Sequence, residues 1–140
     1  MADVIYNGFK AKIMDGSINL GTDTIKVALV TSAYIPDQDL HVFFSSVTNE
    51  VTGTGYTAGG ATLTTKTVTQ DNIGNKGVFD ADDVSWTTST ITARGAVIYK
   101  STGVAGTSPL VAYIDFGADK VSTAGTFTIQ WNASGIVNLS

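Results

Sequence analysis

Hydrophobic residues recur with two different periods along this chain. The first period is helical, and three apolar residues fall on one stripe of it: Tyr6, Phe9 and Ile13. The dipeptide Asp15-Gly16 follows as a stop signal. We therefore expect one short helix at about residues 4–14.

From residue 24 onward the period is two, which is typical of β-strands. In residues 24–31 one set of alternating side chains is strongly apolar: Ile25, Val27 and Leu29. This pattern predicts a strand with one buried face. Pro36 and its acidic neighbours predict a turn after the strand, followed by a surface loop.

Short strand-like pieces then alternate with breaks rich in Gly, Asn and Asp. They include a weak strand at residues 62–69 and a brief one at residues 84–86, where Trp86 is expected in the core. The clearest strands come last. The first is broken at Gly95, where a bulge or a close neighbour would suit the missing side chain. Each strand has one apolar side: Ile91, Ala93, Val97 and Tyr99; Leu110, Ala112, Ile114 and Phe116; Phe127, Ile129 and Trp131.

The order of these elements predicts an all-β protein with one short N-terminal helix. About 8–10 short strands joined by hairpin-sized loops fit an antiparallel β-sandwich or a distorted barrel. The length of 140 residues suits one core, and no linker-like segment interrupts it. We expect a single β-sandwich domain over residues 1–140.

Composition narrows the classes of partner. Hydrophobic residues make up 43% and charged residues only 14%, so Thr, Ser, Asn and Gly must provide a neutral polar surface. The net charge is −4, and no cluster of Lys or Arg favours nucleic acid as a partner. No apolar run reaches the length of a membrane span, and the first residues lack the features of a signal peptide. We expect a chain made in the cytoplasm, with neither nucleic acid nor membrane as partner.

The sequence offers little material for catalysis. It has one histidine and no cysteine, so His41 is the only candidate base for a hydroxyl nucleophile, and nothing in the sequence orients it. A surface or interface histidine is the favoured interpretation. We expect no enzymatic activity and no cofactor.

Three clustered carboxylates deserve separate consideration: Asp80, Asp82 and Asp83. They could act as a catalytic pair or bind calcium. However, their spacing lacks the full calcium-loop pattern and has no glutamate at the required distance. A turn held by Asx-type hydrogen bonds is the favoured interpretation, and no metal site is expected.

Six segments stand in a fixed order along nearly the whole chain: GTDTIKVAL (21–29), YIPD (34–37), GTGYTAGG (53–60), FDADDVSW (79–86), ARGAVIY (93–99) and PLVAYIDFG (109–117). This succession resembles a family of small virion structural proteins of tailed bacteriophages. The resemblance implies a particle component present in many copies and without enzymatic activity.

Within such particles, the resemblance is to capsid decoration, or cement, proteins. It implies a protein on the capsid surface of the virion that binds the major capsid protein and stabilises the shell. If copies also associate with each other, closed cyclic symmetry is expected, and a trimer would suit the local threefold positions of a shell.

Apolar or aromatic residues in loops are the expected contacts, because such groups serve as buried anchors at interfaces. They are Tyr34, Ile35, Leu40, His41, Val42, Phe43, Phe44 and Tyr56. An alternative for Phe43 and Phe44 is that they cap one end of the sandwich. The N-terminal helix is a second candidate contact.

Two other functions remain open at this point. One is a tail or baseplate component of the same particle. The other is a glycan-binding host-attachment module, in which Trp86, Trp131 and Tyr56 would stack on sugar rings. Against it, Trp131 alternates with Phe127 and Ile129 on what should be the inner face.

Overall fold

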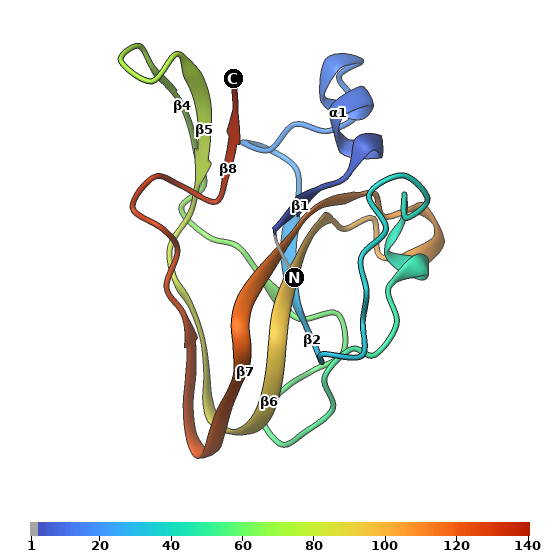
Figure 1. Cartoon of the computed structure of the whole chain (residues 1–140), viewed down its shortest axis with the longest axis vertical. Coiled ribbons are helices and arrows are strands. Elements are labelled where there is room, and N and C mark those ends of the chain that lie inside the picture. The colour runs from blue at the N-terminus through green and yellow to red at the C-terminus, as the bar shows by residue number, and fades with distance from the viewer. Residues whose placement is uncertain (1–2) are drawn as a thin grey trace.

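A long hairpin of β6 (Val84–Lys100) and β7 (Leu110–Ile129) organises the fold (Figure 1). In the computed structural model, which describes residues 3–140, the two strands pair antiparallel from Val84 opposite Ile129 to Tyr99 opposite Leu110. Their connection contains the short 3-10 helix η2 (Ala105–Thr107).

Three shorter strands complete the main sheet, whose order is β1-β7-β6-β2-β3. β1 (Val4–Ile5) pairs with β7, and β2 (Ile25–Val30) pairs with β6. β3 (Ala61–Thr62) lies beyond β2. All of these pairs are antiparallel, as the hairpin-sized loops predict.

The hairpin folds back on itself at the bottom of Figure 1. Thr88 in β6 and Ala124 in β7 both adopt positive φ at this bend, 48° and 44°. The buried hydroxyl of Ser89 lies 2.8 Å from that of Ser122 and donates to the carbonyl of Gly125 at 3.0 Å. These bonds satisfy polar groups that the bend removes from water. The part of β6 before the bend and the part of β7 after it form part of a second layer.

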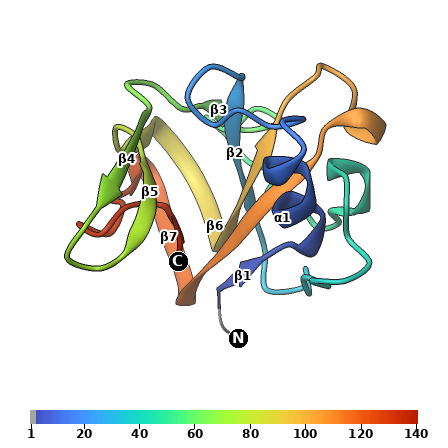
Figure 2. The same cartoon turned by 90° about the horizontal axis from the view of Figure 1, so that it is seen from above.

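A separate small sheet stands at the opposite end of the molecule from the bend (Figure 1), and seen from above it lies apart from the N-terminal helix (Figure 2). It consists of β4 (Thr67–Asp71), β5 (Lys76–Asp80) and β8 (Val137–Leu139), in the order β4-β5-β8. Across from it lies helix α1 (Asn7–Met14). The small sheet and the returning hairpin together face the main sheet.

Two hydrophobic cores cover the two faces of the main sheet. The inner core lies between the layers and includes Phe9, Ile25, Leu29, Phe79, Trp86, Phe127, Ile129 and Trp131. The outer core lies on the opposite face and consists of Tyr6, Ala28, Val30, Tyr34, Val97, Tyr99, Leu110 and Tyr113. The strand predicted at residues 24–31 is confirmed as β2, but both of its faces are buried rather than one.

The predicted fold class is confirmed: the described residues form a mostly β, sandwich-like structure of two antiparallel sheets with one short α-helix near the start. They contain eight strands. Two of these are not short, because β6 has 17 residues and β7 has 20. The weak strand expected at residues 62–69 is divided into β3 and β4, with Thr65 at φ 54° between them.

The break predicted at Gly95 is confirmed, and it has a consequence for the predicted faces. The register shifts between Ala93 and Gly95, and a Cβ at Gly95 would lie 2.5 Å from the Tyr113 ring. Because the bulge adds a residue, the strand turns over there. Ile91 and Ala93 therefore face the inner core, whereas Val97 and Tyr99 face the outer core, so the prediction that all four share one side was wrong.

A second irregularity corrects the prediction for β7. The register also shifts between Ile98 and Tyr99, which places Leu110 in the outer core. Ala112, Ile114 and Phe116 contribute to the inner core as a set. The predicted shared side for Phe127, Ile129 and Trp131 is confirmed, since all three lie in the inner core.

The predicted helix exists, but it begins at Asn7 rather than near residue 4. Val4 and Ile5 pair with β7 as β1 instead. As a result Tyr6 precedes the helix and enters the outer core, while Phe9 enters the inner core. The helix thus crosses the end of the main sheet.

Candidate functional site

The contact loop, residues 34–44, contains every predicted contact residue except Tyr56. Hydrogen bonds hold its backbone in place. The Asp37 carboxylate accepts from two backbone N–H groups within the loop, at 2.9 and 3.0 Å. The Gln38 side chain donates to the carbonyl of Ile5 at 2.8 Å, which ties the loop to β1. The contact loop is therefore a fixed extension of the main sheet.

Exposure divides the predicted contact residues. Ile35 is 69% exposed and Leu40 is 76% exposed, so both present apolar side chains to water. The expectation that Tyr34 is an exposed loop residue was wrong. It is only 1% exposed, because its ring packs edge-on against Tyr113 in the outer core. Asp37 lies between the two exposed residues in sequence and gives the patch an acidic component.

His41 is held within a chain of hydrogen bonds. Its Nδ1 accepts from the backbone N–H of Asp37 at 3.2 Å and lies 3.0 Å from the Tyr34 hydroxyl. The Tyr34 hydroxyl in turn lies 2.8 Å from that of Tyr6. Burial raises the pKa of both tyrosines above the usual value. The groups bonded to the histidine ring therefore belong to the outer core and the contact loop.

The last residues of the contact loop pack on the body. Phe44 stacks on Tyr99 with ring centroids 4.1 Å apart, and the ammonium group of Lys12 lies 5.4 Å from the centroid of the Phe43 ring. The carbonyl of Val42 accepts from the N–H of Leu110 at 2.9 Å. Phe43 and Phe44 are thus half-buried, which agrees with their alternative role of capping the sandwich.

Tyr56 is the remaining predicted contact residue, and it is half-buried. Its hydroxyl donates to the Glu50 carboxylate at 2.6 Å and accepts from the N–H of Leu29 at 3.0 Å. Burial, followed by the bond to Glu50, raises its pKa well above the usual value. Glu50 also accepts from the N–H of Gly59 at 2.7 Å, so these residues fasten the 50–60 loop to β2.

The clustered carboxylates bind different partners instead of converging. Asp80 accepts from the N–H of Ala81 at 2.9 Å, and Asp82 accepts from the Thr65 hydroxyl at 2.6 Å. Asp83 accepts from the N–H of Trp131 at 2.9 Å. Within residues 3–140, no group of three or more His, Cys, Asp or Glu side chains is arranged to hold a metal ion.

The aromatic residues considered for glycan binding lie in the inner core or against it. Trp86 is 7% exposed and Trp131 is 9% exposed, and the Trp131 indole donates to the carbonyl of Asp82 at 2.9 Å. Tyr56 packs against Trp86 with ring centroids 5.9 Å apart. These three rings do not form an exposed stacking platform.

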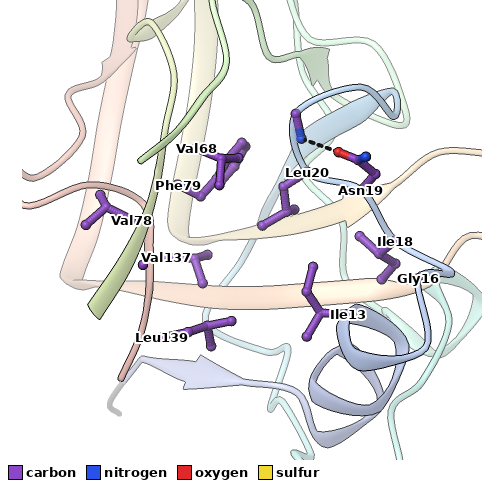
Figure 3. Close-up of a pocket in the computed structure, with 12 residues that line it drawn as sticks. Ile13, Gly16, Ile18, Asn19, Leu20, Val68, Val78, Phe79, Val137 and Leu139 are labelled. Carbon is purple, nitrogen blue, oxygen red and sulfur yellow. Dashed lines mark hydrogen bonds between the residues drawn. The ribbon is translucent and has the colours of Figure 1, made fainter. Parts of the chain in front are cut away.

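An apolar cleft, which the sequence did not predict, lies between the small sheet and the chain that leaves α1 (Figure 3). It has a volume of about 420 Å³. Ile13, Ile18 and Leu20 line one wall. Val68, Phe79, Val137 and Leu139 line the other wall. Asn19 is the one polar residue at its edge, and its side-chain oxygen already accepts from the N–H groups of Gly21 and Thr22.

No signal in the sequence would have located this cleft. Its walls come from the ends of the chain and from the middle, and β8 reaches the site by pairing with β5. Only the alternation of Val137 and Leu139 hints at a strand there, and three residues are too few to identify one by period.

No family model, curated protein or solved structure matches this chain. Within the part of the chain that the structure describes, no helix has the length and apolar character needed to cross a membrane.

Proposed function

We propose that this chain is a structural protein of a tailed-bacteriophage particle, and that it decorates the outer capsid surface by binding the major capsid protein. The observation that carries the proposal is the contact loop. It presents Ile35 and Leu40 to water on a backbone that hydrogen bonds hold in place. Exposed apolar residues on a rigid support favour docking to another protein, because little conformational freedom is lost on binding.

The rest of the molecule supports the same role. A main sheet with both faces buried is a stiff body, and a stiff body transmits force between the subunits it joins. Each decoration site contributes only modest affinity, but many copies acting on one shell add up to a large stabilisation. The order of sequence segments, which resembles that of virion proteins, supports a phage particle as the setting.

The test is a binding experiment with particles that lack the chain. Purified chain is added to these particles, and bound chain is measured by co-sedimentation and located by electron microscopy. We expect saturable binding to the shell at hundreds of sites and a higher temperature of shell disruption. The double substitution of Ile35 and Leu40 by Asp should abolish binding, since it places unpaired charges at the contact.

Val121→Asp provides the matched control. Val121 is 66% exposed and lies near the bend of the hairpin, away from the contact loop, so its substitution should leave binding unchanged. A few copies, or rings along the tail, would replace the capsid assignment with a tail or baseplate role. Binding that survives the double substitution would overturn the assignment of the contact loop.

A further inference from the structure

The small sheet has two unpaired edges. Its order is β4-β5-β8, and within residues 3–140 no other strand pairs with the outer side of β4 or of β8. Free edges invite pairing with another strand, so proteins usually guard them with Lys, Pro or a bulge. Here β4 (TVTQD) has one charged residue, Asp71 at its hairpin end, β8 (VNL) has none, and neither contains Lys or Pro. Both edges are open templates for a further strand.

Exposed apolar residues accompany both edges. Val68 in β4 is 61% exposed, and Ile73, at the tip of the β4–β5 hairpin, is 98% exposed. At the other edge, Leu139 in β8 is 38% exposed, and Met14, at the end of α1, is 82% exposed. The hairpin tip, the end of β8 and α1 all lie at the top of Figure 1. Each edge thus combines free backbone groups with apolar side chains in water.

The register of the small sheet places Val68, Phe79 and Val137 level with one another. Residues paired across neighbouring strands point to the same face of a sheet, as do residues two apart on one strand. These three side chains and Leu139 therefore point to the same side of the sheet, toward the apolar cleft. A strand added beside β8 would therefore direct every second side chain into the cleft. One added strand would therefore both pair with β8 and fill the apolar cleft.

We propose that the β4 edge of one copy of this chain pairs with the β8 edge of a second copy. Val68 of the incoming copy then occupies the apolar cleft of the second copy, and Ile73 of the incoming copy lies toward α1 of the second copy. An acyl chain could fill the cleft, but it would leave the backbone groups of β8 unpaired. Another strand meets both requirements, and every copy supplies β4, whose one charged residue, Asp71, lies at its hairpin end.

This contact joins two different surfaces, so it is head-to-tail. Head-to-tail contacts between identical chains form a closed ring when the rotation closes and a filament when it does not. Within one copy, β4 and β8 both run antiparallel to β5 and hence parallel to each other. In a ring whose axis follows the strands, the new pair is therefore parallel. The inference concerns self-association alone and does not rest on the proposed function.

Two single substitutions test the contact in the full-length chain. Val68→Lys charges the β4 edge, and Leu139→Lys charges the β8 edge. Both side chains are partly exposed, so the monomer should fold normally, which circular dichroism checks. The wild-type chain should associate with increasing concentration in analytical ultracentrifugation. Each substitution should weaken association on the order of 100-fold, because it places an unpaired charge in the contact.

Mixing the two variants distinguishes a head-to-tail contact from a symmetric one. The Val68→Lys chain keeps an unaltered β8 strand, and its substituted side chain lies on the cleft wall two strands away from that edge. The Leu139→Lys chain keeps an unaltered β4 edge. A mixture should therefore form a one-to-one dimer, detected by native mass spectrometry with one chain isotope-labelled. Val121→Lys, a substitution of a similarly exposed valine away from both edges, should associate like the wild type.

Three results would overturn the proposal. A wild-type chain that stays monomeric at high concentration has no such contact. Association that survives either single substitution does not use both edges. Failure of the mixture to form the dimer, with both variants folded, shows that the two edges do not pair with each other. None of these results bears on binding to phage particles, which the contact-loop variants test separately.

Discussion

The main sheet and the small sheet of this protein differ in how completely they are buried. Both faces of the main sheet carry a hydrophobic core, and the last four residues of β2 are all buried. The small sheet packs through Phe79 and Val137 on one face only, and all of β4 except Asp71 is exposed. Two sheets in one short chain thus have unequal shares of the core.

The difference separates what determines the fold from what remains available to partners. Burying apolar surface is the main favourable contribution to folding, so the main sheet should account for most of the stability. A strand that is exposed on one face and unpaired at one edge contributes little, but it retains the capacity to bind. We expect substitutions of the same chemical kind to have very different effects in the two sheets.

The largest difference in the free energy of unfolding is expected when a leucine in each sheet is replaced by alanine. Leu29 in β2 is fully buried, so Leu29→Ala should lower the free energy of unfolding by about 3 kcal/mol, from lost burial and the cavity left behind. Leu139→Ala in the small sheet should cost only about 0.5 kcal/mol. Urea unfolding of both variants, at a dilution where the chain is monomeric, measures this. Similar losses would mean that the small sheet belongs to the stable core.

Glycines in the two sheets give a second contrast of intermediate size. A methyl group at Gly95 would meet the rigid, buried ring of Tyr113 at 2.5 Å, so Gly95→Ala should lower the free energy of unfolding by about 1–3 kcal/mol through overpacking. A methyl group at Gly77 in β5 would find its nearest neighbour at 4.0 Å. Gly77→Ala should therefore be neutral or stabilise the protein by about 0.5 kcal/mol. Thermal unfolding of the two variants compares them directly, and a destabilised Gly77→Ala would contradict the idea of a loosely packed small sheet.

Gly95 also shows how far the sequence could predict the main sheet. A glycine inside an apolar strand correctly indicated a bulge or a close neighbour, and both occur. The reversal of faces beyond it was not predictable from alternation, because the register shift depends on pairing with β7. Tyr99 was therefore assigned to the wrong side even though its strand was identified correctly.

The contact loop shows the corresponding limit for the candidate site. Tyr34 and Ile35 are adjacent and both follow a strand, yet one is buried and the other exposed. What buries Tyr34 is the hydroxyl of Tyr6 and the ring of Tyr113, which are far away in the sequence. Local pattern indicated an apolar loop, whereas only the tertiary structure decides which of its residues face water.

The five tyrosines provide a third test, whose effect is absent at neutral pH and appears only in alkali. Tyr6, Tyr34, Tyr99 and Tyr113 lie in the outer core and Tyr56 packs against the inner core, so none belongs to the small sheet. Burial raises the pKa of all five, and that of Tyr99 rises to about 12.

The sign of the effect on stability follows from these shifts. A tyrosine in the unfolded chain has a pKa of about 10, lower than in the folded protein. Its hydroxyl therefore loses its proton more readily in the unfolded state, and high pH favours unfolding. The stability is fully present below about pH 10 and is lost as the pH rises through the folded pKa of Tyr99, about 12. Tyrosinate absorbance should therefore rise together with the loss of circular dichroism, in one transition above pH 10, whereas chain unfolded in urea should titrate near pH 10. A tyrosine that ionises near pH 10 while the dichroism stays native would show that part of the main sheet opens to water independently, and the contrast between the two sheets would then fail.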